Sequence, residues 1–266
     1  MFDPSSYHAI QFDRSGRILT IRLNRPEQLN AANEQMHTEL ARVFREADDD
    51  PGSDVLVLTG TGRAFCAGGD ISWMQSAIDN PEQFSGRTRR EGKNIVFSML
   101  EVEKPLIAKV NGAAVGLGAT LALFCDVVFA SEKARIGDPH VSVGLVAGDG
   151  GAVIWPQLIG HARAKEYLMT GDLIPAPLAA QIGLINHAVP HEELDARVAA
   201  FCERLVNGAL TAIRYSKMSV NLNLKQIAHS VLDASLGYEC LSNRHPDHQA
   251  AVKAFHEGRT PEFKRG

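Results

Sequence analysis

One short segment of the chain, residues 137–151, concentrates side chains that can move protons. It reads GDPHVSVGLVAGDGG and contains His140 together with Asp138 and Asp149. A histidine gains or loses a proton near physiological pH, and a neighbouring carboxylate can set which ring nitrogen carries it. His140 is therefore the first candidate for a general acid or base, and Asp149 is the second. The alternative for His140 is a packed, hydrogen-bonded side chain, and for Asp149 a helix cap.

Two glycine-rich loops are the other candidates for chemistry. Residues 60–70 and 111–118 each follow a predicted buried strand and precede a helix, so their glycines can bring backbone close to a ligand. The first loop lacks the GxxxxGK[ST] of a nucleotide P-loop, and the second lacks the GxGxxG of a dinucleotide turn. Backbone N–H groups at such turns suit a developing oxyanion. Ordinary tight turns are the alternative.

Composition limits the class of protein. The 266 residues are 45% hydrophobic and 22% charged, which is typical of a globular chain. A net charge of −4 gives no electrostatic reason to bind nucleic acid or an anionic membrane. The most apolar stretch, 119–130, is shorter than the roughly 20 residues that span a bilayer. The first residues lack a signal-peptide pattern and the cysteines are dispersed, so we expect a cytoplasmic protein with reduced thiols and no metal site.

The elements that position these residues follow from hydrophobic periodicity. The pattern predicts an opening hairpin, then strands that alternate with helices, then a mostly helical C-terminal third, which together indicate a layered α/β fold. The predicted strands are 8–13, 17–24, 55–58, 106–110 and 127–130. The predicted helices are 33–48, 73–84, 82–100, 119–124, 178–182, 194–205, 212–224 and 248–256. Tyr238, Glu239 and His245 also carry reactive groups, but the sequence does not place them relative to a site.

Several ordered motifs resemble the enoyl-CoA hydratase/isomerase, or crotonase, superfamily over nearly the whole chain. They are RPEQLNAAN (25–33), RAFCAGGDI (63–71), KPLIAKVNGAAVGLGATLALFCDVVFASEKARIG (104–137), LMTGDLIPAPLAAQIGLINHAVP (168–190) and DHQAAVKAFHEGRTPEFKRG (247–266). The resemblance implies a spiral of ββα units over residues 1–190 and a C-terminal helical trimerisation region over 191–266 of the same domain. It also implies a homotrimer or a hexamer built from two trimers. The implied ligand is an acyl-CoA thioester, with no cofactor beyond the coenzyme A of the substrate.

The same resemblance assigns roles to individual positions. Two backbone N–H groups would hold the thioester carbonyl oxygen and stabilise an enolate, and the matching motifs place them at Gly69 and Leu117. Leu117 stands where a glycine is common, but only its N–H is needed. Arginines suit the phosphates of coenzyme A because their planar fork binds two oxygens. The implied substrate-binding residues are Arg25, Arg63, Ala67, Gly68, Asp70, Ile71, Ser72, Gly116 and Thr120.

The chain departs from the family pattern where hydratases carry two glutamates. Those positions are Thr120 and His140, so the pair of carboxylates that adds water across a double bond is absent from its usual place. His140 or Asp149 would then move protons. Hydration or isomerisation of an enoyl-CoA is the leading hypothesis. Thioester hydrolysis, decarboxylation or carbon–carbon cleavage on the same scaffold, and a non-catalytic acyl-CoA binder, are the alternatives. A nucleotide-dependent oxidoreductase is disfavoured by the missing GxGxxG.

Overall fold

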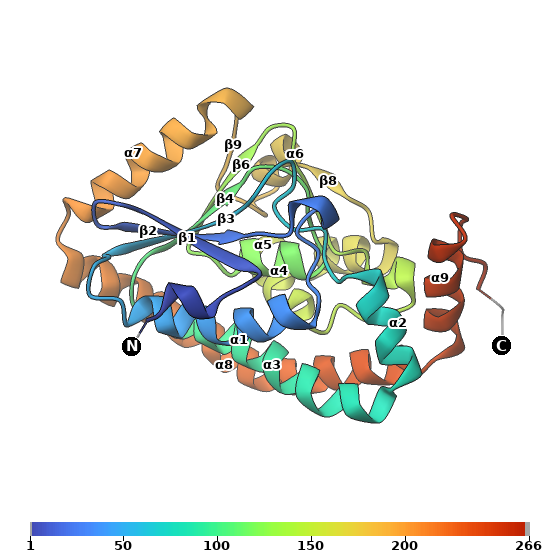
Figure 1. The fold of residues 1–266 in the computed structure, drawn as a ribbon. Coiled ribbons are helices and arrows are strands. Elements are labelled where there is room, and N and C mark those ends of the chain that lie inside the picture. The colour runs from blue at the N-terminus through green and yellow to red at the C-terminus, as the bar shows by residue number, and fades with distance from the viewer. Residues whose placement is uncertain (1, 264–266) are drawn as a thin grey trace.

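A largely parallel sheet, with one antiparallel strand at its edge, organises the structure (Figure 1). The computed structural model describes residues 2–263, without the side chains of 82–85. Within these residues, the strands of the main sheet follow the order β1 (Ile10–Ser15), β2 (Ile18–Leu23), β3 (Val55–Gly60), β4 (Leu106–Val110), β6 (Val127–Ser131) and β9 (His187–Val189). A small second sheet contains β5 (Ala114–Val115), β7 (Arg135–Gly137) and β8 (Ile174–Pro175). The predicted α/β class is confirmed.

The opening hairpin forms as the alternating pattern predicts. Strands β1 and β2 pair in antiparallel register from Ile10 opposite Leu23 to Ser15 opposite Ile18. Gly16 makes the turn with a φ of +54°, a conformation that favours glycine. From β2 onward the neighbouring strands of this sheet are parallel. Each crossover between them therefore leads from the end of one strand through a loop and helix to the start of the next.

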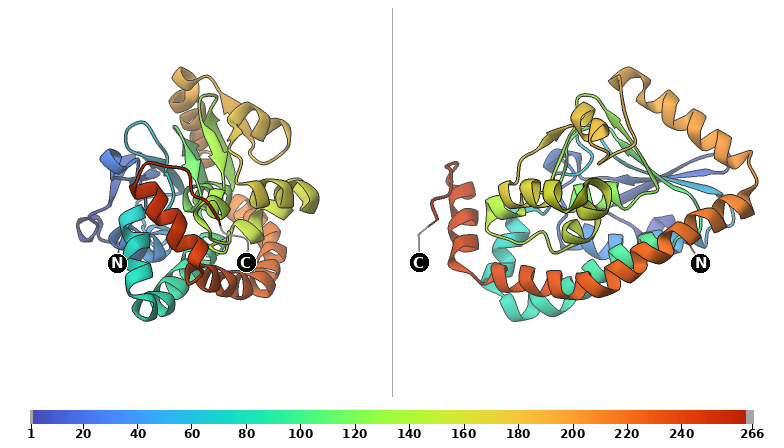
Figure 2. Two further views of the ribbon diagram at one scale, coloured as in Figure 1. Left: turned by 90° about the vertical axis from the view of Figure 1, so that its right-hand side faces the viewer. Right: turned by 180° about the vertical axis from the view of Figure 1, so that it is seen from behind.

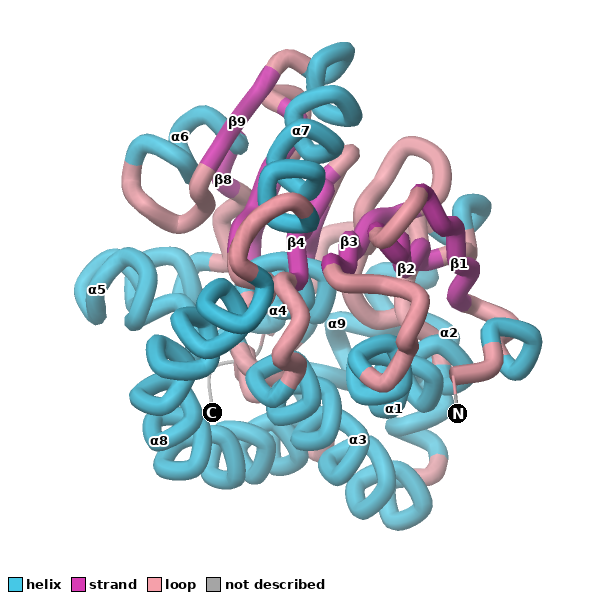
Figure 3. The backbone as a smooth tube through the Cα atoms, turned by 90° about the vertical axis from the view of Figure 1, so that its left-hand side faces the viewer, coloured by secondary structure: helices cyan, strands magenta, loops and turns pink. Residues whose placement is uncertain are grey.

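Helices cover both faces of the main sheet (Figure 3). Alternate residues of β3 point to opposite faces, as expected for a strand buried on both sides. Val55 and Val57 pack with α7, whereas Leu56 and Leu58 join the larger core beneath α1, α3 and α8. The helices are α1 (Glu34–Asp48), α2 (Ile71–Asp79), α3 (Pro81–Glu101), α4 (Leu117–Leu123), α5 (Gly151–Thr170), α6 (Ala176–Gln181), α7 (Leu194–Val206), α8 (Leu210–Asn243) and α9 (Pro246–His256). Short 3₁₀ helices cover Pro4–Ser6, Pro26–Gln28, Pro139–Val143 and His191–Glu193.

Two helix predictions need correction, and one helix was not predicted. The helix predicted over 73–84 is α2, which ends at Asp79, and Pro81 starts α3. The helix predicted over 212–224 is α8, which continues to Asn243 because Gly237 lies inside it without breaking it. Helix α5 was not predicted, since its Pro156 and its kink at Gly160 resemble helix breakers. The C-terminal region is helical as expected.

Helix α8 is the longest helix of the described chain and links distant parts of the fold (Figure 2). Near its start, Lys217 Nζ donates to the backbone oxygen of Lys104 at 2.8 Å and pairs with Asp126 at 2.8 Å. Near its end it packs on the loop that precedes α5. Asp126 also accepts a hydrogen bond from Leu106 N at 2.7 Å, so its carboxylate joins α8 to the start of β4. Within the described residues, no helix has the length and apolarity that a bilayer crossing requires.

Candidate active site

An inner cavity lies where α2, α3, α4 and α8 meet the segment 138–149. Its volume is about 890 Å³, including its open mouth. Apolar side chains form much of its wall, among them Trp73, Met74, Leu145 and Leu236. An outer groove runs along residues 67–71 and 115–116. Gly69, Met74 and His140 line both spaces, so the two are continuous.

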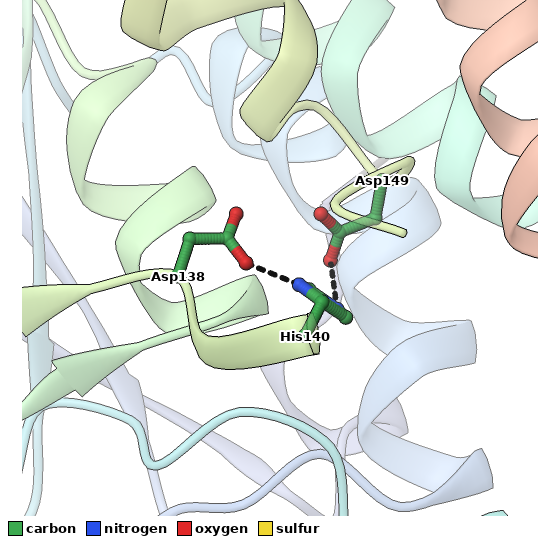
Figure 4. Close-up of side chains that lie close together, drawn as sticks. All are labelled: Asp138, His140 and Asp149. Atoms are coloured by element: carbon green, nitrogen blue, oxygen red, sulfur yellow. Dashed lines mark hydrogen bonds and ion pairs between the residues drawn. The ribbon is translucent and has the colours of Figure 1, made fainter. Parts of the chain in front are cut away.

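Asp138, His140 and Asp149 lie close together (Figure 4), and His140 and Asp149 line this cavity. Asp138 hydrogen-bonds to His140 Nδ1, and His140 Nε2 lies 3.8 Å from Asp149 Oδ2. Thr120 Oγ1 donates to the other oxygen of Asp149 at 3.1 Å. The histidine ring therefore lies between two carboxylates, with Asp138 fully buried behind it and Asp149 at the cavity wall.

Burial and charge shift the pKa values of this cluster. Burial lowers the pKa of His140, but the carboxylates of Asp138 and Asp149 outweigh it and raise that pKa well above its ordinary value. Burial raises the pKa of Asp149, and the charge of His140 opposes this rise only in part. His140 is therefore an imidazolium at neutral pH, and Asp149 is a stronger base than an exposed aspartate.

Gly69 and Leu117, the predicted backbone donors, line the same cavity. Gly68 O accepts from Ala32 N at 2.7 Å and Asp70 N donates to Ala32 O at 3.0 Å. In such a parallel bridge, the N–H of the intervening Gly69 points away from Ala32. Leu117 is the first residue of α4, where backbone N–H groups have no partner within the helix. Among the hydrogen bonds of the described residues, neither N–H has a protein acceptor.

Close contact between the two glycine-rich loops sets this arrangement. Cys66 N donates to Ala113 O, and Val115 N donates to Cys66 O. A Cβ atom at Gly118 would lie 2.3 Å from Cys66 O, and one at Gly112 would lie 2.1 Å from Arg63 O. Glycine is required at both positions because the backbones cross with no space for a side chain.

The predicted substrate-binding residues fall into three places. Ala67, Gly68, Asp70, Ile71 and Gly116 line the outer groove. Thr120 is buried behind Asp149. Ser72 borders a separate surface depression next to Asp70 and Arg25.

The two predicted phosphate-binding arginines differ in their surroundings. Arg25 pairs with Asp70 at 3.0 Å and hydrogen-bonds to Ala31 O, so its guanidinium holds the first glycine-rich loop. Arg63 is exposed and is not among the residues that line the inner cavity or the outer groove. Phosphate binding by either arginine stays a prediction.

The structure adds cavity residues that the sequence did not assign. His37 lines the cavity from α1 and hydrogen-bonds to Glu91 at 2.8 Å. Arg89, Asn243 and Arg244 line its mouth, and no motif marks them. Of the three unplaced C-terminal residues, Glu239 lines the cavity. Tyr238 is 62% exposed, and the side chain of His245 is also 62% exposed.

The cluster of Asp138, His140 and Asp149 is also, by residue type, a candidate metal site. One ligand atom from each lies within 4.8 Å of the others. The two ring nitrogens of His140, however, face different carboxylates. One ion could not bind the ring and both carboxylates without breaking the bond between Asp138 and His140. The geometry suits a chain of proton-sharing groups better than a metal site.

Comparison with known proteins shows which family this chain resembles. The enoyl-CoA hydratase/isomerase family model matches residues 13–266. A crotonyl-CoA hydratase of Syntrophomonas wolfei is 32% identical, covering 97% of this chain and 98% of the relative. A 1,2-epoxyphenylacetyl-CoA isomerase of Escherichia coli is 32% identical, covering 92% and 94%.

A solved structure gives the same result. The crystal structure of an enoyl-CoA hydratase/isomerase from Mycobacterium paratuberculosis superposes with a TM-score of 0.88 at 37% identity, covering 92% of this chain and 97% of the other. Both the sequence and the fold therefore match over nearly their full length. The chain belongs to the enoyl-CoA hydratase/isomerase family.

Proposed function

We propose that this protein hydrates or isomerises an unsaturated acyl-CoA thioester. The observation that carries the proposal is that Gly69 and Leu117, whose N–H groups have no protein acceptor among the described residues, line the same cavity as Asp149 and His140. Two donors on one oxygen stabilise the negative charge that develops when the thioester becomes an enolate. A base beside that oxygen can then act on water or on a carbon next to the carbonyl.

The cavity, the groove and the side chains each have a separate role in this reaction. The acyl chain occupies the apolar inner cavity, and the pantetheine arm lies in the outer groove, because the two meet at Gly69. Asp149 removes a proton from water or from carbon, and the thioester oxygen takes up the resulting charge. His140, held by Asp138, stabilises the Asp149 carboxylate and exchanges protons with it.

The test is incubation of the purified protein with a panel of saturated and unsaturated CoA thioesters in deuterated water, followed by mass spectrometry. Added water identifies a hydratase, deuterium on carbon without added water an isomerase, and free CoA a hydrolase. Retained ester without exchange, despite binding, would contradict the proposal and favour a non-catalytic binder.

Replacement of Asp149 by Asn tests the assigned base. We expect turnover of the best ester to fall about 10²–10⁴-fold, the usual contribution of a positioned proton acceptor. Asn keeps the shape of the side chain and can still bond to Thr120, so binding of the ester should change little. Turnover within a few-fold of the wild type would assign the base elsewhere. Asp233→Asn is the matched control, since Asp233 is exposed on α8 and pairs with Lys93 outside the cavity.

A further inference from the structure

Glu239 belongs to a row of α8 residues that faces the Asp149 loop. Ser235, Glu239 and Ser242 are four and three residues apart, so they share one face of the helix. Ser235 Oγ donates to Gly148 O at 2.9 Å, and Val146 N donates to Ser242 Oγ at 3.1 Å. These two bonds bracket Glu239 and fix its backbone against residues 146–148.

The carboxyl of Glu239 is close to this loop but has no partner in it. A Cβ atom at Gly148 would lie 2.7 Å from Glu239 Cβ and 2.7 Å from Glu239 Oε2, so only glycine leaves room for the side chain. Oε2 is buried and, among the described residues, has no hydrogen-bond partner. The side chain also lines the inner cavity together with Asp149 and His140.

A buried carboxyl oxygen without a partner, such as Oε2 of Glu239, calls for an explanation, because buried polar atoms are nearly always hydrogen-bonded. An ionised carboxylate here would lack donors and would face the negative charge of Asp149. The protonated acid avoids that cost and has a proton to donate. Its natural partner is a group that enters the cavity.

Among the described residues, Asp149 and Glu239 are the two carboxylic acids that line the inner cavity. Asp149 precedes α5, and Glu239 lies on α8, 90 positions further along the chain. Both line one cavity beside the backbone donors. Together they form a pair in which one carboxyl can accept a proton while the other donates one.

We propose that Glu239 is a catalytic residue that delivers a proton to a carbon of the enolate, as the acid partner of Asp149. The assignment rests on the proposed function. In hydration, Asp149 takes a proton from water, the water oxygen bonds to the β-carbon, and the electron pair of the double bond passes to the thioester enolate. The enolate collapses as the Glu239 O–H bond breaks and a new C–H bond forms at the α-carbon.

The proton transfers balance in isomerisation as well. Asp149 then takes a proton from one carbon, and Glu239 gives a proton to another. Each cycle leaves Asp149 protonated and Glu239 ionised, and one proton transfer between them, directly or through His140 or water, restores the starting state.

The charges around Glu239 agree with an acid role. Burial, followed by the charge of Asp149, raises the pKa of Glu239 to about 8. The ionisable groups that face it or share its cavity are Asp138, His140 and Asp149 from the 138–149 segment, His37 from α1, Arg89 from α3, and Cys240 and Arg244 from α8 and its end. Glu239 is thus mostly protonated at neutral pH, and the wild-type rate should fall as pH rises through about 8, where the acid is lost.

The test compares the wild type with Glu239→Gln and Glu239→Asp on the ester that the wild type converts best. We expect Glu239→Gln to lower kcat about 100-fold or more while KM changes less than about threefold, because Gln fills the same space without a transferable proton. The fall in rate above pH 8 should disappear from its residual activity. Glu239→Asp should recover part of the rate, and Asp233→Asn should match the wild type.

Two results would overturn the proposal while the proposed function stands. One is a Glu239→Gln protein with kcat within about threefold of the wild type. The other is a Glu239→Gln protein whose lowered kcat still falls above pH 8 and is accompanied by a lower thermal stability, with no recovery of rate in Glu239→Asp. A purely structural role of Glu239 predicts that combination. A wild type that binds the esters but converts none would overturn both.

Discussion

The bond between Asp138 and His140 determines the charge at the centre of the site. Asp138 is buried, and only one of its two oxygens has a partner among the described residues. Its other oxygen lies near the start of α5, where a Cβ atom at Gly151 would be 2.2 Å away. The carboxylate therefore lies close to the N-terminus of α5, where the helix carries a partial positive charge.

Replacing Asp138 with Asn should lower the pKa of His140, because a negative charge that favours the imidazolium is lost. His140 would then titrate at lower pH, and the proton relay to Asp149 would weaken, with turnover reduced about 10²-fold or more. Nitrogen-edited NMR of labelled histidine follows the titration. An unchanged midpoint would show that Asp138 does not control the ring.

The same shift has a consequence for folding stability. The pKa of His140 in the folded protein lies above the value of about 6.5 expected in the unfolded chain. The interaction therefore stabilises the wild type fully below about pH 6.5, and this stabilisation is lost as pH rises through the folded-state pKa. Asp138→Asn should flatten that part of the curve of unfolding free energy against pH.

Residue type carried much of the site prediction but not all of it. His140 and Asp149 stand out because they lie in one short segment with glycines, whereas Gly69 and Leu117 were singled out by the family resemblance. The importance of Glu239 depends on how α8 packs, and nothing near it in the sequence signals a site.

At the scale of elements, the site depends on where backbones cross. Gly118, the second residue of α4, packs against the first loop with no room for a methyl group beside Cys66 O. Gly237, in contrast, lies within α8 with no atom within 4 Å of an added Cβ. Close packing therefore requires glycine at position 118, whereas position 237 has space for a side chain, although both lie in helices.

Gly118→Ala should lower both thermal stability and turnover, since the Cβ would push the two loops apart and displace the N–H groups of Gly69 and Leu117. We expect a loss of roughly 1–3 kcal/mol, as for an overpacked site. Gly237→Ala should instead stabilise the protein by about 0.5–1 kcal/mol, because alanine favours a helix. Thermal unfolding and ester turnover measure both effects. Equal behaviour of the two variants would contradict the backbone-crossing argument.

Elements were predictable where the apolar pattern was regular. The predicted helix over 33–48 forms with Asn33 as its cap, which accepts from Met36 N at 3.0 Å. Helix α5 was missed since Pro156 and Gly160 break the local pattern, and tertiary packing of Val153, Ile154 and Trp155 outweighs them. The full length of α8 was missed for a related reason, because its buried positions are few and include Ala228 and Ser235.

At the scale of the whole molecule, exposed apolar side chains gather on α8. Tyr215 and Leu222 are 64% and 63% exposed and lie seven residues apart, hence on one face of the helix. Surfaces of this kind mark contacts between proteins. This agrees with the trimer or hexamer implied by the family resemblance, which stays a prediction.

We expect the wild type to sediment at three or six times its 28.8 kDa mass. The double substitution Tyr215→Lys, Leu222→Lys should lower that mass, because charged side chains oppose burial of this face. Analytical ultracentrifugation measures both. A wild type that sediments as a monomer would refute the prediction, and a double variant with unchanged mass would exclude this face from the interface.

The bonds from Ser235 and Ser242 to the Asp149 loop also bear on how the chain matures during synthesis. The strands of the main sheet are complete by residue 189, but the loop at 146–148 gains its contacts only when residues 235–242 have left the ribosome. Until then the larger core lacks α8, and its apolar face is uncovered. A nascent chain paused before α8 would contain both glycine-rich loops but would lack Glu239. Its exposed apolar core would then be open to binding by chaperones. Competence for catalysis should therefore arise late and in one step, when the last long helix docks.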